Sequence, residues 1–318
     1  MKARSVLAGL TMLLASATAA PAIAADIVVG VPNWPSVRVT AHIVKVVLED
    51  NLGVEVELQQ GTNPIVFEAM DQGSMHVHPE VWLPNQQNLH DQYVVEAQTV
   101  EMNPNGVPAF TAFCATKYTA DEHGVTSLTD LTDPEKAALF DTDGDGMGEI
   151  WIGASGWAST NIEKIRAKSY GFDQTMNLLE MDETLALAAL DAAVEANDPF
   201  VMMCYTPHHM FSLHDLVPLS EPDHDPEKWV IVQPTDDADW LNMSSAPVAW
   251  PAPQLHLHFA KSLRETNPAA AELLSNMAFD TDQLSAMTYA LVVDGVDPEE
   301  YARNWVQQNS DTVDSWLQ

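Results

Sequence analysis

Positive charge is scarce in this chain of 318 residues, which has 13 Lys and Arg against 46 Asp and Glu and a formal net charge of -33 at neutral pH. So acidic a protein is repelled by phosphate backbones and by anionic lipids, which argues against nucleic acid or an anionic membrane surface as its partner. Hydrophobic residues still make up 46% of the chain. That fraction supports a folded core, excludes intrinsic disorder, and at this length predicts one large or two medium domains.

Cysteine is also rare, with only Cys114 and Cys204 in the whole chain. Each lies in an apolar run that is typical of a buried strand, at 110–114 and 201–204. The two residues could bridge neighbouring strands or remain buried thiols, because the sequence does not give the Cα separation that a disulfide requires. Of these alternatives we expect free thiols.

Long hydrophobic runs are missing after the N-terminal segment, since no later run reaches the roughly 18 apolar residues of a membrane-spanning helix. Residues 1–25 have the three parts of a signal peptide. Lys2 and Arg4 give a positive start, 6–20 is uncharged and apolar, and 22–24 offers a small-residue cleavage site. The sequence therefore predicts a chain that is exported to the periplasm.

The rest of the chain alternates strands and helices, as in an α/β fold. The β-branched run at 26–31 predicts a buried strand, and Ser36 is expected to be the N-cap of a helix ending near Gly53. Thr160 and Glu163 predict a capping box at the start of a later helix. Further strands are expected at 54–58, 77–83, 107–116, 150–154 and 200–205, and helices at 255–264, 269–278, 283–293 and 299–308.

Four aromatic residues stand close to the ends of expected strands: Trp34, Trp82, Trp157 and Tyr205. Ligands of open α/β sheets bind beyond the carboxyl ends of the strands, so the four rings are expected to converge. Ring faces attract a permanent cation that has no N–H to donate. Any one tryptophan could simply fill the core, but the set predicts an aromatic cage for a methylated cation.

A ligand with an anionic tail also needs hydrogen-bond donors. The backbone N–H groups of Ser36 and Val37 open the helix after Trp34, and a helix N-terminus attracts anions. His208 follows the strand of Tyr205 and adds a side-chain donor. These residues are expected to hold the tail while the cage holds the methylated head.

An acidic loop at 141–149 has the spacing of a Ca²⁺ site, with carboxylates at its first, third and fifth positions and Gly146 at the sixth. The expected ligands are Asp141, Asp143, Asp145, the backbone carbonyl of Met147, and Glu149. The twelfth position is Ile152 and a strand follows, so the loop is not an EF-hand. We expect a structural Ca²⁺, with a solvated acidic turn as the alternative.

Histidine pairs at 76/78, 208/209 and 256/258 leave two other functions open. One is a secreted metal-dependent hydrolase that uses Asp141, Asp143 and the histidines. The other is a zinc- or manganese-binding carrier. Neither is supported by a G-x-S-x-G, H-E-x-x-H or P-loop motif, and the pair at 256/258 faces apart if it lies on the expected helix.

The segments 28–53, 75–85, 150–160 and 205–211 resemble the substrate-binding proteins of glycine betaine/proline betaine-type ABC importers. The resemblance implies a type II periplasmic-binding fold, with 26–111 and 217–318 in lobe 1 and 112–216 in lobe 2. The chain crossings would then fall near 110–115 and 216–222. It also implies a non-enzymatic protein whose partner is an ABC permease in the inner membrane.

The loop at 141–149 resembles the marine branch of that family, which binds trimethylamine N-oxide and has a calcium ion near the lobe junction. The chain departs from that branch at Tyr205, where a fourth Trp is expected, and in having no acid in the 107–116 strand. Glycine betaine and dimethylsulfoniopropionate are therefore expected as ligands at least as much as trimethylamine N-oxide.

Overall fold

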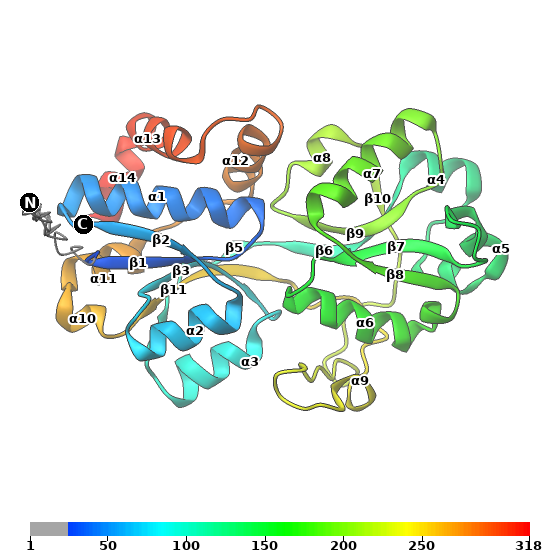
Figure 1. Ribbon diagram of the computed structural model, residues 1–318, viewed down its shortest axis with the longest axis horizontal. Helices are drawn as coiled ribbons and strands as arrows, with labels where there is room; N and C mark the ends of the chain where they lie inside the picture. The colour runs from blue at the N-terminus through cyan, green and yellow to red at the C-terminus, as the bar shows by residue number, and fades with distance from the viewer. Residues whose placement is uncertain (1–24) are drawn as a thin grey trace, which may run out of the picture.

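The computed structural model describes residues 25–318. The expected signal peptide, 1–25, lies outside the described residues apart from Ala25. The described chain forms two α/β lobes side by side, each built on its own sheet (Figure 1). The prediction of a two-lobed α/β fold is confirmed.

The first lobe contains a six-stranded sheet in the order β2-β1-β3-β11-β4, with β5 paired to β11. Its strands are β1 (Ile27–Val31), β2 (Val56–Gln60), β3 (Val77–Leu83), β4 (Val100–Met102), β5 (Val107–Pro108) and β11 (Gln254–Ala260). Strands β1, β2 and β3 are parallel, whereas β11 runs antiparallel to β3, β4 and β5. The carboxyl ends of β1 and β3 therefore point toward the same edge.

Helices cover both faces of this sheet (Figure 1). They are α1 (Pro35–Leu52), α2 (Asn63–Gln72), α3 (Gln87–His90), the π-helical turn η1 (Asp91–Glu96), α10 (Leu263–Thr266), α11 (Pro268–Asn276), α12 (Thr281–Val292), α13 (Pro298–Gln308) and α14 (Ser310–Trp316). Trp34, not Ser36, occupies the N-cap position of α1, with Pro35 at its first turn. The expected Ser36 cap is wrong because that hydroxyl points to a buried carboxylate, that of Glu80.

The second lobe contains a five-stranded sheet in the order β10-β6-β9-β7-β8. Its strands are β6 (Phe110–Thr116), β7 (Gly148–Gly153), β8 (Met176–Glu180), β9 (Val201–Thr206) and β10 (Leu216–Pro218). Its helices and turns are α4 (Lys117–His123), η2 (Leu128–Thr132), α5 (Pro134–Ala137), η3 (Ala138–Phe140), α6 (Ala158–Tyr170), η4 (Phe172–Gln174), α7 (Glu183–Ala196), α8 (Met210–Leu213) and α9 (Trp240–Met243).

The chain passes from the first sheet to the second between β5 and β6, at Ala109. It returns later than expected, because 219–250 packs on the second lobe. Lys168 of α6 donates to the carbonyl of Leu241 at 3.0 Å, and the indole of Trp250 donates to buried Glu163 at 2.7 Å. The return therefore lies near 251–253, not at 216–222.

The segment 219–250 also reaches back to the first lobe. The Asn88 side-chain amide donates to Thr235 Oγ1 at 3.2 Å and to Asp236 Oδ1 at 2.9 Å. Asn88 belongs to α3, so these bonds join the lobes outside the region of the aromatic rings.

Two other local expectations are wrong. Thr160 and Glu163 form no capping box, because α6 begins at Ala158 and Glu163 pairs instead with buried Arg166. Residues 254–260 form a strand and not the start of a helix.

The two cysteines are not free thiols. Cys114 on β6 and Cys204 on β9 form a disulfide with a Cα–Cα distance of 5.8 Å. The two strands are antiparallel neighbours in the second sheet, which brings the cysteines together across 90 residues of sequence.

Within residues 25–318, no helix combines the length and apolar character needed to cross a bilayer.

Candidate functional site

A cavity between the lobes brings the four predicted aromatic residues together. Its volume is about 380 Å³ including its open mouth. The lining residues are Trp34, Asn63, Trp82, Asn85, Gln86, Thr111, Trp157, Ala158, Ser159, Met203 and Tyr205. None of these carries an acidic or basic side chain, so the described wall of the cavity is aromatic and neutral.

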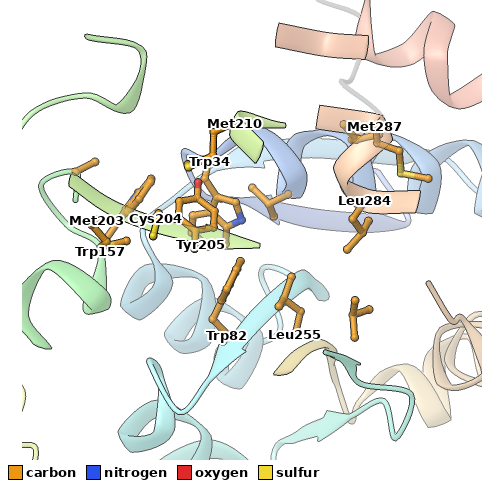
Figure 2. Close-up of a cluster of buried hydrophobic side chains, with 14 of the residues drawn as sticks. Trp34, Trp82, Trp157, Met203, Cys204, Tyr205, Met210, Leu255, Leu284 and Met287 are labelled. Carbon is orange, nitrogen blue, oxygen red and sulfur yellow. The ribbon is translucent and has the colours of Figure 1, made fainter. Parts of the chain in front are cut away.

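Each lobe contributes two of the rings. Trp34 follows β1 and Trp82 lies near the end of β3, while Trp157 follows β7 and Tyr205 lies near the end of β9. The rings meet edge to face, with centroids 5.5 Å apart for Trp82 and Tyr205, and 6.0 Å apart for Trp157 and Tyr205 (Figure 2). In each of these pairs the edge of one ring meets the face of the other. We call the four side chains the ring cluster.

Glu80 is a buried acid directly behind the ring cluster, and sequence reasoning missed it. Its Oε1 accepts hydrogen bonds from the indole N–H groups of Trp34 at 2.8 Å and Trp82 at 3.1 Å, and from the Ser36 hydroxyl at 2.5 Å. Burial raises the pKa of the Glu80 carboxyl to about 7, although these hydrogen bonds oppose the shift. A lone acid inside the apolar strand 77–83, two residues before Trp82, is the signal that could have revealed it.

Glu183 plays a corresponding part in the second lobe. This buried residue opens α7 and accepts a hydrogen bond from the hydroxyl of Tyr205. Burial, reinforced by the neighbouring Glu183, raises the pKa of the Tyr205 hydroxyl well above its usual value. Tyr205 therefore stays neutral, with its hydroxyl directed to Glu183.

The residues expected to hold an anionic tail do not reach the cavity. Ser36 is bonded to Glu80, Val37 is fully buried, and neither lines the wall. His208 lies behind Tyr205, with ring centroids 4.9 Å apart and its Nε2 3.3 Å from Glu183.

A different helix start faces the cavity, that of α6. Its first two residues, Ala158 and Ser159, line the wall and belong to a helix of 13 residues. Three side chains add polar atoms to the same wall. Asn85 Oδ1, Gln86 Oε1 and Thr111 Oγ1 are buried and have no hydrogen-bond partner within 25–318. Two of these unmet atoms are amide oxygens, which accept hydrogen bonds, and the third is a hydroxyl, which donates or accepts.

The acidic loop places four carboxylates near one another. Oxygens of Asp141, Asp143, Asp145 and Glu149 lie within 4.8 Å of one another, which fits a hard cation with oxygen ligands. Glu149 Oε1 is buried and has no partner in the described part of the chain. Met147, whose carbonyl was the fifth expected ligand, lies between Asp145 and Glu149.

The loop is not at the lobe junction. It precedes β7, whereas Trp157 follows the other end of that strand. A strand of six residues spans about 20 Å. This position differs from the lobe junction, where the resemblance places the calcium ion of the marine branch.

The histidine pairs do not form a metal centre. His256 and His258 are on β11. The Nε2 of His258 lies 3.1 Å from the Nδ1 of His90, and burial holds the pKa of His258 well below its usual value. Among residues 25–318, the acidic loop is the group of such side chains that could hold a metal ion.

Comparison with known proteins gives a consistent result. The glycine betaine/proline betaine-binding periplasmic protein of Salmonella typhimurium is 23% identical over 259 residues, covering 73% of this chain and 72% of that protein. The trimethylamine N-oxide-binding protein of Pelagibacter ubique is 25% identical over 302 residues, covering 89% and 88%. Both are binding proteins.

Solved structures support the fold. Lactococcal OpuAC in its closed-liganded conformation with glycine betaine has a TM-score of 0.70 at 19% identity, covering 92% of this chain and 99% of that one. An ABC-transporter choline binding protein in complex with choline has a TM-score of 0.71 at 20% identity, covering 92% and 91%.

The family model that matches is described as the substrate binding domain of an ABC-type glycine betaine transport system, and it spans residues 25–308. This span includes both sheets and the whole ring cluster. Domains of this kind are solute-binding parts of transporters and not enzymes, so the hydrolase alternative is wrong. The chain belongs to the family of substrate-binding domains of ABC-type glycine betaine transport systems.

Proposed function

We propose that this protein captures a methylated onium osmolyte in the periplasm and delivers it to an ABC permease in the inner membrane. The candidate ligands are glycine betaine, dimethylsulfoniopropionate and trimethylamine N-oxide. One observation carries the proposal: four rings from two lobes enclose a cavity whose described wall has no charged side chain.

The ring cluster suits a cation without N–H groups. A methylated ammonium or sulfonium centre makes no hydrogen bonds, and ring faces attract it by about 1–2 kcal/mol per desolvated contact. Ring faces do not replace the hydrogen bonds that an ordinary ammonium makes with water, at a cost of about 1–3 kcal/mol for each unmet group. The wall therefore selects against lysine-like and protonated primary amines.

The polar part of the wall suits a carboxylate. The start of α6 offers backbone N–H groups, and Asn85, Gln86 and Thr111 can donate from amide and hydroxyl groups. Glycine betaine and dimethylsulfoniopropionate carry a carboxylate opposite the methylated centre, so both ends find complementary groups. This favours them over trimethylamine N-oxide, which presents one oxygen next to its methyl groups.

Isothermal titration calorimetry with glycine betaine, dimethylsulfoniopropionate, trimethylamine N-oxide and choline tests the proposal. We expect the parent protein to bind at least one of the first three. Trp82→Ala and Trp157→Ala should each weaken that binding by about 1–3 kcal/mol, or roughly 5- to 150-fold. Replacement of either residue by Phe should cost less, because a ring face remains.

Trp305→Phe is the matched control, since Trp305 is buried in α13 and does not line the cavity. It should bind like the parent. If both Ala variants also bind like the parent, the ring cluster is not the ligand site.

We further propose that the acidic loop holds Ca²⁺ in a structural role, through Asp141, Asp143, Asp145, Glu149 and the carbonyl of Met147. Its support is the mutual approach of the four carboxylates and the lone oxygen of Glu149. The loop lies about one strand length from Trp157, so its ion would act on the stability of the second lobe.

A further inference from the structure

We propose that Glu80 is a positioning residue that fixes Trp34 and Trp82 and places a negative charge behind them, so that capture of a methylated cation depends on the ionisation of this carboxyl group. The inference rests on the proposed function and deepens it. It assigns the countercharge of the ligand to a residue that the ligand does not touch.

The first step is the geometry. One oxygen of Glu80 accepts both indole N–H groups and the hydroxyl of Ser36, while its other oxygen accepts a hydrogen bond from Thr40 at 3.3 Å. Two rings that share one acceptor have a fixed relative orientation. Glu80 is 2% exposed and does not line the cavity, so it acts on a guest through Trp34 and Trp82.

The second step is the charge balance around Glu80. None of the ion pairs in the described part of the chain includes it. On its own strand, burial lowers the pKa of His78 to about 3, so that ring is neutral. Across the lobes Tyr205 is neutral, and on β11 the buried His258 is also neutral. The Ser36 donor is uncharged, and so are the residues that line a small cavity together with Glu80: Thr40, Pro79, Asn103, Asn105, Val107, Leu255, Leu257, Met277, Phe279 and Leu284.

The third step is what a guest would change. An indole N–H that donates to an anion is polarised toward greater negative charge on its ring, which strengthens the attraction of the ring face for a cation. A cation in the cavity is then the countercharge that Glu80 lacks. Ligand binding and loss of a proton from Glu80 therefore favour each other.

The sign of the pH effect follows. The carboxyl of the empty protein has a pKa near 7, raised by burial. A bound cation lowers that pKa, so binding releases a proton at neutral pH. Affinity is full above about pH 8 and decreases as the pH falls through 7, by up to about ten-fold per pH unit for one linked proton.

Calorimetry of glycine betaine binding in two buffers with different ionisation enthalpies counts the protons released. At pH 7 we expect the parent protein to release a fraction of one proton, and its affinity to rise about ten-fold between pH 6 and pH 8. Glu80→Gln keeps an oxygen that accepts the indole bonds but has no charge. It should release no proton, show a flat pH profile, and bind about ten-fold more weakly at pH 8.

Ser36→Ala is a second variant that leaves Glu80 in place. It removes a donor that stabilises the anion, so the midpoint of the affinity profile should move to higher pH. If Glu80→Gln does not fold, the proton count of the parent and this shift still decide the question.

Two results overturn the inference while leaving the proposed function intact. One is binding by the parent with no proton release and a flat pH profile. The other is an unmoved midpoint in Ser36→Ala, which would show that a different group titrates. Failure of the parent to bind any of the osmolytes would instead refute the proposed function itself.

Discussion

At the scale of single residues, buried acidic side chains hold three of the four rings, whereas the indole of Trp157 donates to Asn33 of the first lobe at 3.1 Å. Glu80 accepts bonds from Trp34 and Trp82, and Glu183 accepts one from Tyr205. The second oxygen of Glu183 is buried and has no partner among the described residues. Loss of the hydrogen bond from Tyr205 therefore lowers the free energy of unfolding more than loss of the same bond to an exposed acid would.

Tyr205→Phe tests this difference between ring face and hydroxyl. The variant leaves Glu183 buried without its donor, which should lower the free energy of unfolding by about 1–3 kcal/mol in urea denaturation. The aromatic face remains, so affinity for a methylated cation should change much less than in Trp82→Ala. Tyr93→Phe, at a half-buried tyrosine on η1 outside the cavity wall, is the control. Equal stability of Tyr205→Phe and the parent would contradict this view.

The residues of the site were predictable to different degrees. Trp34, Trp82, Trp157 and Tyr205 could be found because each stands near the end of a strand, and strand ends share an edge. The hydrogen-bond donors for the anionic end of a ligand could not be assigned from the positions of strand ends. Which of two helix starts faces the cavity depends on how the lobes meet, and the start of α6, not that of α1, lines the wall.

At the scale of elements, the acidic loop and the ring cluster are linked by β7. The loop runs into the start of β7 at Gly148, and Trp157 of the ring cluster follows the other end of that strand, so a change that loosens the loop acts on the strand that leads to Trp157. The four carboxylates repel one another when no cation is near. A bound Ca²⁺ would remove that repulsion and order the entry to β7.

Chelation provides the test. Ca²⁺ at about 100 times its Kd stabilises the folded state by about 2.7 kcal/mol, which corresponds to a rise in Tm of roughly 5 °C for a chain of this size. EDTA should remove that increment and added Ca²⁺ should restore it. Asp143→Asn should abolish the response, whereas Asp198→Asn, at an exposed acid after α7, should keep it. A Tm that ignores EDTA in the parent would identify the loop as an acidic turn.

The elements themselves were largely readable from the sequence, and the exceptions have physical causes. The run 254–260 alternates apolar residues with histidines, yet both sets are buried because β11 lies inside the sheet. The alternation has the period of two that is typical of a strand, so the sequence did contain this signal. The disulfide depends on the pairing of β6 with β9, which joins segments 90 residues apart and leaves no local signal.

At the scale of the whole molecule, two of the contacts between the lobes differ in their relation to the cavity. One is the ring cluster, where Trp82 meets Tyr205 across the lobes. The other is the contact of Asn88 with Thr235 and Asp236, on the segment that returns late to the first lobe. Only the first of these contacts lines the cavity. The second affects a ligand solely through the population of the closed form.

Asn88→Ala should therefore weaken the binding of every accepted ligand by the same factor. The loss of two hydrogen bonds, at about 0.5–1.5 kcal/mol each, predicts a decrease of roughly 5- to 150-fold in affinity. Titration calorimetry with glycine betaine and dimethylsulfoniopropionate measures the ratio of the Kd of the variant to that of the parent for each ligand. Gln87→Ala, which removes a bond to Asp91 within the same lobe, should leave both affinities unchanged. If Asn88→Ala changed the order of the ligands by affinity, Asn88 would affect selectivity and this interpretation would be contradicted.

Because 219–250 contacts the first lobe away from the cavity, the overall affinity for ligands and the selectivity among them depend on different residues. Substitutions along 233–236 can change the ligand concentration at which half of the protein is occupied. They do so without altering which solute the protein accepts. A lineage exposed to scarcer or richer supplies of one osmolyte could then adjust its uptake threshold by changing surface residues alone. The aromatic interior would remain constant through such adjustment.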